Sequence, residues 1–288
     1  MSAVSAGRST RLLNATVANL TRLVLATLLL AAWAHTLGQG VSGPALPWLF
    51  VSGVVGFGLG DLALYAAFAH IGSRLMVLLF LCVSAPLGAL MEWLWLGSGL
   101  TVSQMFWGGV ILAGVALALT TDTATSATRR DRVVGPVMGL IAAMGQAGGA
   151  VLTRKAFDVA DQAGRHIDGA TAAYQRILGG VLLTLVVLLV GRHLFKGCAQ
   201  TRFRDPSHQW RQAWPRVVAN AFCGPALGVA CFQWPLAVEK TGIVLAIVAT
   251  TPLVVIPFTY MIDGDRPGIR SLVGGAVAVL GAAVLAFR

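Results

Sequence analysis

The stretch LGDLALYAAFAHIGS at residues 59–73 decides the fold, because a related stretch, LGVACFQWPLAVEKT, occurs at residues 227–241. Both stretches begin with Leu-Gly and continue as apolar sequence. A second match precedes them, since "ANLTRLVLATLLL" with Arg22 is echoed by "AAYQRILGGVLLT" with Arg176. The two halves of the chain therefore share elements in the same order, which is typical of an internal repeat.

Two further matches follow the paired stretches. Pro86 corresponds to Pro252, and each proline lies near the middle of the next apolar run. Gly108 and Gly274 then each lie 22 residues after that proline. Four matches in one order are not expected by chance, so we interpret the chain as two related units.

The composition predicts a multi-span membrane protein. The chain has 288 residues, of which 57% are hydrophobic and 11% charged, and its mean hydropathy is +0.78. Soluble domains carry about 25% charged residues. The formal charge of +10 could suggest nucleic acid, but no polar stretch is long enough to form a basic soluble module. We read the excess arginine as a topology signal, which places the N-terminus in the cytoplasm and the C-terminus outside.

The long apolar runs are predicted to be helices, because backbone groups in lipid must be hydrogen-bonded within their own segment. Most runs reach the roughly 20 residues that a helix needs to cross the bilayer. We predict nine spans, at residues 17–37, 47–69, 73–96, 103–121, 133–155, 170–190, 216–238, 242–262 and 268–287.

The predicted fold is an all-α polytopic membrane protein with two inverted five-helix repeats. The first unit covers residues 1–122 with four helices, residues 123–132 form a linker, and the second unit covers 133–288 with five helices. The second unit has a span ahead of its arginine helix and the first unit does not, so we expect the first unit to lack its first helix. Because five is odd, complete units would have opposite orientations in the membrane, as in many secondary transporters.

These matched elements resemble those of the drug/metabolite transporter superfamily, specifically the EamA-type permeases. The resemblance rests on the elements already described and on two glycine patterns, GGVILAGVALAL at 108–119 and GGAVAVLGAAVLAF at 274–287. It implies ten helices in two five-helix units, with both ends cytoplasmic, and export of amino acids or other small metabolites. The expected nine helices and the charge-based orientation depart from that pattern.

Charged residues inside membrane spans are costly and are therefore functional candidates. The candidates here are Arg22, Asp61, Glu92 and Arg176. With a rise of 1.5 Å per residue, Arg22 and Asp61 lie about 8 Å and about 12 Å from the same face, so we expect them to pair. Arg176 and Glu92 lie about 9 Å and about 6 Å from the opposite face and could form a second pair.

Asp61 is the strongest candidate for binding a substrate or a proton. Its repeat counterpart is Val229, so the carboxylate is not part of the repeated scaffold. A lone carboxylate facing a cavity could bind an ammonium group or carry a proton. Tyr65 lies one helical turn later on the same face. For the arginines the alternative is a purely structural pair, and Glu92 lies close enough to an interface to be solvated.

Neutral groups complete the candidate site. Gln146, Gln233 and Trp234 lie within second-unit spans, and Gln233 stands at the repeat position of Tyr65. Prolines interrupt helical hydrogen bonding, so three of them could kink helices and gate a cavity: Pro86, Pro252 and Pro257. The five histidines are scattered and the four cysteines lack CxxC spacing, so we expect no metal site and no cofactor.

One motif suggests a different function. Gly58-Leu59-Gly60-Asp61 spells G-x-G-D, which resembles the motif of intramembrane aspartyl proteases. Such an enzyme needs a second carboxylate in the same site, and every other aspartate falls outside or at the edge of a span. We therefore expect no enzyme. A channel or a non-transporting scaffold remains an alternative.

The sequence thus predicts a secondary transporter in the plasma membrane that exports small metabolites by alternating access. Its expected partners are a small-molecule substrate and the lipid bilayer, with no nucleic acid and with a homodimer left open.

Overall fold

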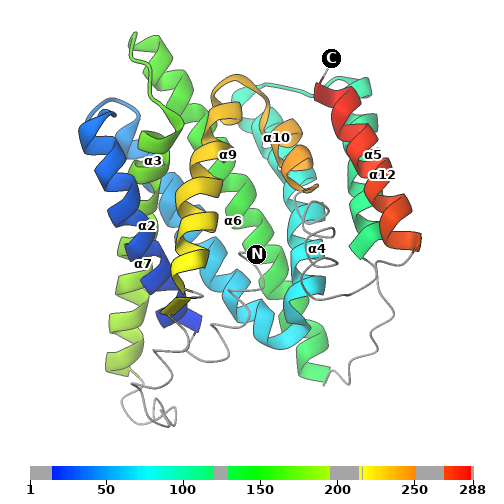
Figure 1. The fold of residues 1–288 in the computed structure, drawn as a ribbon, viewed down its shortest axis with the longest axis horizontal. Helices are drawn as coiled ribbons and strands as arrows, with labels where there is room; N and C mark the ends of the chain where they lie inside the picture. Colours follow the sequence, from blue (N-terminus) through cyan, green and yellow to red (C-terminus); the bar gives the residue numbers. More distant parts are fainter. Residues whose placement is uncertain (1–14, 120–128, 195–213, 216, 251–268, 287–288) are drawn as a thin grey trace.

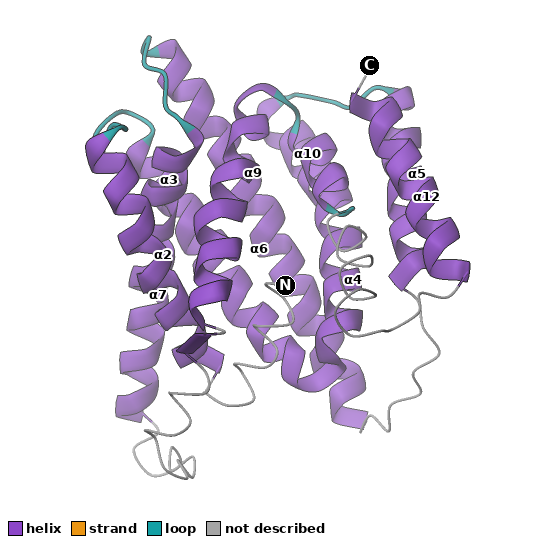
Figure 2. Ribbon diagram, viewed as in Figure 1, coloured by secondary structure: helices purple, strands orange, loops and turns teal. Residues whose placement is uncertain are grey.

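The computed structural model describes residues 15–119, 129–194, 214–215, 217–250 and 269–286. Within these ranges every regular element is helical (Figure 2). Two shorter apolar helices, Val102–Leu117 and Val273–Val284, accompany the six that are long and apolar enough to cross a membrane. Those six are Thr16–Thr36, Leu46–Phe68, Leu79–Leu96, Val133–Gln162, Gly169–Val190 and Val217–Val238.

In the first half of the chain, two predicted spans share one continuous helix. The elements are α2 (Ala15–Thr36), α3 (Leu46–Gly53), the π-helical segment η1 (Val54–Gly60), α4 (Asp61–Leu96) and α5 (Val102–Leu119). The break predicted between spans 47–69 and 73–96 is absent, since α4 continues through it. Figure 1 shows the chain descending from α3 and rising again along α4, so the turn is made without loss of helix. Gly97, at φ +71°, ends α4 in the left-handed conformation that glycine adopts readily.

The second half repeats this order and adds a long helix in front. Its elements are α6 (Arg129–Gln162), α7 (Gly169–Leu194), η2 (Phe222–Ala226), α9 (Leu227–Val238), α10 (Thr241–Val248) and α12 (Ile269–Ala286). The predicted span 242–262 is described only in its first part. Pro252 and Pro257 lie outside the described residues. Pro86 lies inside α4, which continues past it.

Both halves carry a π-helical segment at the same place. Val54 and Phe222, the first residues of η1 and η2, each lie five residues before the Leu-Gly pair of the repeated stretch. In η1 the sequence VVGFGLG contains three glycines, and in η2 Pro225 interrupts regular α-helical hydrogen bonding. Such wide turns are rare and occur often at functional sites.

Helices at equivalent repeat positions pack on one another. The pairs are α2 with α7, α4 with α10, and α5 with α12 (Figure 1). The π-helical segments exchange partners in the same way, since η1 packs on α7 and η2 packs on α2. The packing is therefore reciprocal between the two halves of the described chain.

Helix α6 packs along α4, η1 and α3. The closest approach is between two glycines, because a Cβ on Gly145 would lie 2.6 Å from the Cα of Gly60. Any side chain there would push η1 and α6 apart. This close contact places Asp61, which directly follows Gly60, beside α6.

Candidate functional site

The first polar cluster is built around an ion pair between α2 and α4. Nη2 of Arg22 donates to Oδ2 of Asp61, so the pair expected from their depths is present. Nε of Arg22 donates to Oδ1 of Asn19, one turn earlier on α2, at 2.9 Å. Two acceptors therefore hold the guanidinium in one orientation within the bundle.

Tyr65 extends this cluster to the second unit. The centroid of its ring lies 4.9 Å from Cζ of Arg22, a cation–π distance. The Tyr65 hydroxyl accepts a hydrogen bond from Nδ2 of Asn220 at 3.0 Å. Asn220 lies just before η2, so the cluster joins α2 and α4 to the helix that enters the second π-helical segment. We call Asn19, Arg22, Asp61, Tyr65 and Asn220 the arginine–aspartate cluster.

The charges of this cluster balance within it. The side chains of Arg22 and Asp61 are largely buried, and a buried ion is costly unless it is paired and hydrogen-bonded. Because Arg22 compensates Asp61, a cation or a proton that binds the carboxylate must compete with the guanidinium. The cluster can therefore act as an exchange site, in which binding at Asp61 releases Arg22.

Arg176 occupies the equivalent place on α7 but has a different environment. Its Cζ lies 5.0 Å from the centroid of the Phe57 ring. A Cβ on Gly56 or on Gly149 would lie 2.6 Å or 2.7 Å from its Nη2, so the two glycines leave room for the guanidinium. Its Nε has no hydrogen-bond partner, and within the described part of the chain no carboxylate forms an ion pair with it.

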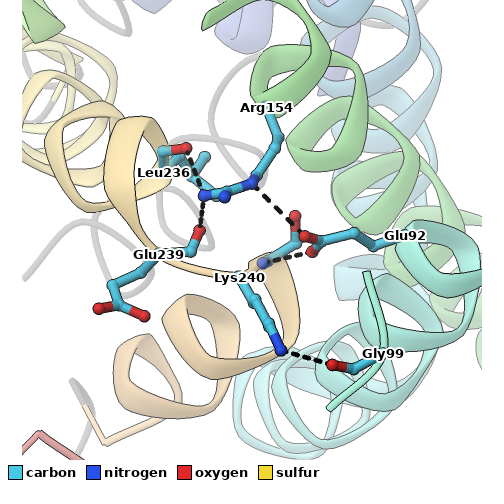
Figure 3. Close-up of polar contacts among 7 residues, drawn as sticks. Glu92, Gly99, Arg154, Leu236, Glu239 and Lys240 are labelled. Carbon is cyan, nitrogen blue, oxygen red and sulfur yellow. Dashed lines mark hydrogen bonds and ion pairs between the residues drawn. The ribbon is translucent and has the colours of Figure 1, made fainter. Parts of the chain in front are cut away.

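Glu92 does not meet Arg176, contrary to our expectation, and it is not solvated. The side chain is 1% exposed, and its Oε2 accepts a hydrogen bond from the backbone N–H of Thr241 at 2.5 Å (Figure 3). Its Oε1 lies 3.4 Å from Nε of Arg154. The expectation was wrong because depth does not fix the direction of a side chain, and Glu92 points toward Arg154 of α6 and the start of α10.

Arg154 and Lys240 complete this second cluster. Nη1 of Arg154 donates to the carbonyl oxygens of Leu236, at 3.3 Å, and Glu239 (Figure 3). Nζ of Lys240 donates to the carbonyl oxygen of Gly99 at 2.5 Å. All these contacts surround Glu239 and Lys240, which connect α9 to α10 and which we call the α9–α10 corner. In Figure 1 this connection lies at the upper edge of the molecule.

The remaining predicted site residues are dispersed. Gln233 is fully buried, and both polar atoms of its amide lack a hydrogen-bond partner among the described residues. Trp234 is 54% exposed, and its indole lies against Gly169 at the start of α7. Gln146 is half-buried on α6. The structure does not bring these three residues into either cluster.

A cavity that we did not predict lies between α4, α5 and α10. Its volume is about 530 Å³ and its walls are mainly apolar, with Pro86 among them. Gly108 and Gly109 border it, and a Cβ on either would meet no atom of the described residues within 4 Å. These two glycines therefore line open space, whereas a Cβ on Gly114 of the same helix would lie 2.7 Å from the backbone of α12.

Sequence reasoning missed four residues that hold the clusters together: Asn19, Asn220, Arg154 and Lys240. A signal existed for the two asparagines, because amide side chains are uncommon in apolar spans and Asn19 stands three residues before Arg22. Arg154 and Lys240 lie next to predicted span ends, where charged residues are ordinary. Only the extent of α6 and the position of the α9–α10 corner show their partners.

The comparisons with known proteins agree with this architecture. The model of the EamA-like transporter family matches residues 133–287. No protein in a curated set matches the chain. A solved structure, described as the crystal structure of a protein, superposes with a TM-score of 0.72 at 18% sequence identity. The superposition covers 99% of this chain and 91% of the other chain, which shows a shared fold.

Proposed function

Because this chain belongs to the EamA-like transporter family, we propose that it is a secondary transporter that exports a small polar or amphipathic metabolite by alternating access. The family and the six apolar helices of membrane length among the described residues indicate an integral membrane protein, and we place it in the plasma membrane. Members of this family are generally not enzymes. The partner of Asp61 is an arginine and not a second carboxylate, which gives the protease alternative no support.

The observation that carries the proposal is the arginine–aspartate cluster. It holds a compensated ion pair, where a charge inside the membrane is expected to serve a function. It also joins the two units, since Asn220 of the second unit contacts Tyr65 of the first. A ligand that changes these contacts can therefore change how the units are held together.

In the proposed mechanism, Asp61 exchanges partners during transport. A substrate ammonium group or a proton binds the carboxylate and displaces Arg22, and the loss of that pair loosens the contact of α2 with α4. The sequence contains no GxxxxGK[ST] motif for nucleotide binding. An ion gradient or the gradient of the substrate itself would then drive the cycle.

The test measures transport by the purified protein. A sensitivity screen of expressing cells selects metabolites, and flux of each is then measured in proteoliposomes. Asp61→Asn should lower the flux at least about tenfold, because contacts to a buried charged group contribute about 1.5–3 kcal/mol. Asp161→Asn, which removes an exposed aspartate at the end of α6, is the matched control. Equal flux in both variants, or no substrate-dependent flux across the panel, would contradict the proposal.

A further inference from the structure

The α9–α10 corner leaves two helix ends side by side. Glu239 (φ −109°, ψ 156°) and Lys240 (φ −65°, ψ 139°) are extended, so α9 stops at Val238 and α10 starts at Thr241. A helix that ends has unpaired carbonyls with partial negative charge, and a helix that starts has unpaired N–H groups with partial positive charge. Both kinds of group need partners when they are buried.

Charged side chains from two other helices supply those partners. Arg154 of α6 binds the carbonyls at the end of α9, and Glu92 of α4 accepts the first N–H of α10. Each charge has the sign that its helix end favours. The two side chains also approach each other at 3.4 Å. One ion pair thus compensates both ends of the helix break.

Three of these contacts cross between the predicted units, and one of them is the pair of Glu92 with Arg154. Glu92 and Gly99 belong to the first unit, and their partners Thr241 and Lys240 belong to the second. Gly99 and Gly242 also border the apolar cavity between α4, α5 and α10. A movement that separates α10 and the α9–α10 corner from α4 and Gly99 must break the contacts made by Thr241 and Lys240, and it would widen the cavity from this edge.

From this arrangement we infer that Glu92, Arg154 and the α9–α10 corner form a latch that holds this edge of the protein closed. The latch opens when Glu92 releases the N-terminus of α10. The role of the latch as one gate of a transport cycle rests on the proposed function. The contacts that hold α10 against α4 do not depend on that function. Opening is unfavourable because Oε2 of Glu92 loses its backbone partner while the carboxylate remains buried.

The test measures access to Thr241, which is fully buried in the closed latch. Its hydroxyl has no hydrogen-bond partner among the described residues, and the contact to Glu92 is made by its backbone N–H, so Thr241→Cys leaves that contact undisturbed. The four native cysteines, Cys82, Cys198, Cys223 and Cys231, are first replaced by serine. The full chain is purified in detergent, and the rate of its modification by a charged methanethiosulfonate reagent is measured.

Glu92→Gln should speed this modification at least about tenfold, as expected when a buried charged hydrogen bond is lost. Glu239→Gln is the matched control, because the Glu239 carboxylate points away from Arg154 and only its carbonyl takes part (Figure 3). Lys240→Gln removes the contact to Gly99 and should give a smaller increase. If Glu92→Gln does not yield folded protein, Lys240→Gln decides the outcome.

Modification of the Glu92→Gln protein at the rate of the Glu239→Gln control would overturn the latch, and so would an unchanged rate in Lys240→Gln when that variant decides. The labelling needs no substrate. If Glu92→Gln speeds the labelling but the parent protein shows no flux, transport is refuted and the latch stands. If the parent protein shows flux but Glu92→Gln leaves the labelling rate unchanged, only the latch is refuted.

Discussion

Arg22 and Arg176 occupy equivalent places in the two halves of the molecule, and both are buried. Arg22 has a carboxylate partner, Asp61, and an amide partner, Asn19. Arg176 has an aromatic ring and two glycines around its guanidinium. The scaffold is therefore repeated while its charge compensation is not, because the counterpart of Asp61 is Val229.

This difference separates the arginine, which the fold uses in both halves, from the carboxylate, which is present in the first half only. An arginine at this position packs between helices in both halves, so its long side chain serves the scaffold. The carboxylate exists in one half only, so packing of the repeat does not explain it. Among the described residues Arg176 forms no ion pair, and a buried cation without one destabilises the fold. The stabilities of variants at Arg22 and Arg176 can therefore be compared.

The largest effect is expected when each arginine is replaced by methionine. Arg22→Met leaves the Asp61 charge buried without a partner, which should destabilise the protein by about 3–5 kcal/mol. Arg176→Met removes a cation whose Nε has no hydrogen-bond partner and should leave stability unchanged or higher. Thermal unfolding of both purified variants in detergent measures the difference. Equal losses would mean that the two arginines are equivalent and that Asp61 adds nothing.

A smaller effect is expected one turn further along the repeated stretch. Tyr65→Phe removes the hydroxyl that Asn220 binds and should cost about 1 kcal/mol. Gln233→Leu, at the equivalent position, removes an amide with no partner and should cost nothing. Unfolding in the same detergent tests the pair of variants, with Trp234→Phe as the control for an exposed neighbour. A larger loss for Gln233→Leu would reverse the comparison.

The smallest effect is expected at the start of α7, the helix that carries Arg176. Asp168 caps this helix by accepting hydrogen bonds from the N–H groups of Ala170 and Thr171, both at 3.0 Å. Burial raises the pKa of Asp168, but hydrogen bonds from Thr171, Trp33 and Ala170 outweigh it, so the pKa is lowered.

Because the folded protein has the lower pKa, this stabilisation is present above about pH 4, the pKa of an unfolded aspartate, and is lost as the pH falls further. Asn caps helices as well as Asp does. Asp168→Asn should therefore match the parent at neutral pH and lose less stability on acidification. Melting temperatures from pH 7 to pH 3 measure this, and an identical pH dependence of both proteins would contradict it.

The sequence was sufficient to predict the Arg22–Asp61 pair because two facts determined it. The helices that carry the two residues are consecutive and antiparallel, and residue counting gives both residues a similar depth. The estimated depths of Glu92 and Arg176 were not sufficient to predict their partners. Counting gives height along the membrane normal but not the direction in which a side chain points, and Glu92 points toward α6 and α10.

The helix boundaries explain the other differences. Apolar patterns predicted the long helices, since burial in lipid requires them, but not the continuity of α4 or the extension of α6 to Gln162. The sequence near residue 70 contains no proline that would force the helix to end there. The π-helical segments were also not predicted, because a single extra residue leaves no periodic signal in a uniformly apolar run.

Those segments have a geometric consequence. A helix is a screw, and each extra residue that a wide turn accommodates rotates everything beyond it by about 100° relative to what precedes it. Segment η1 ends directly before Asp61, so it sets the angular phase at which the carboxylate leaves the helix. Segment η2 sets the same phase for Val229. Both halves thus carry a rotation of this kind before the repeated stretch. Only in the first half does the rotated helix then carry a charged residue, Asp61.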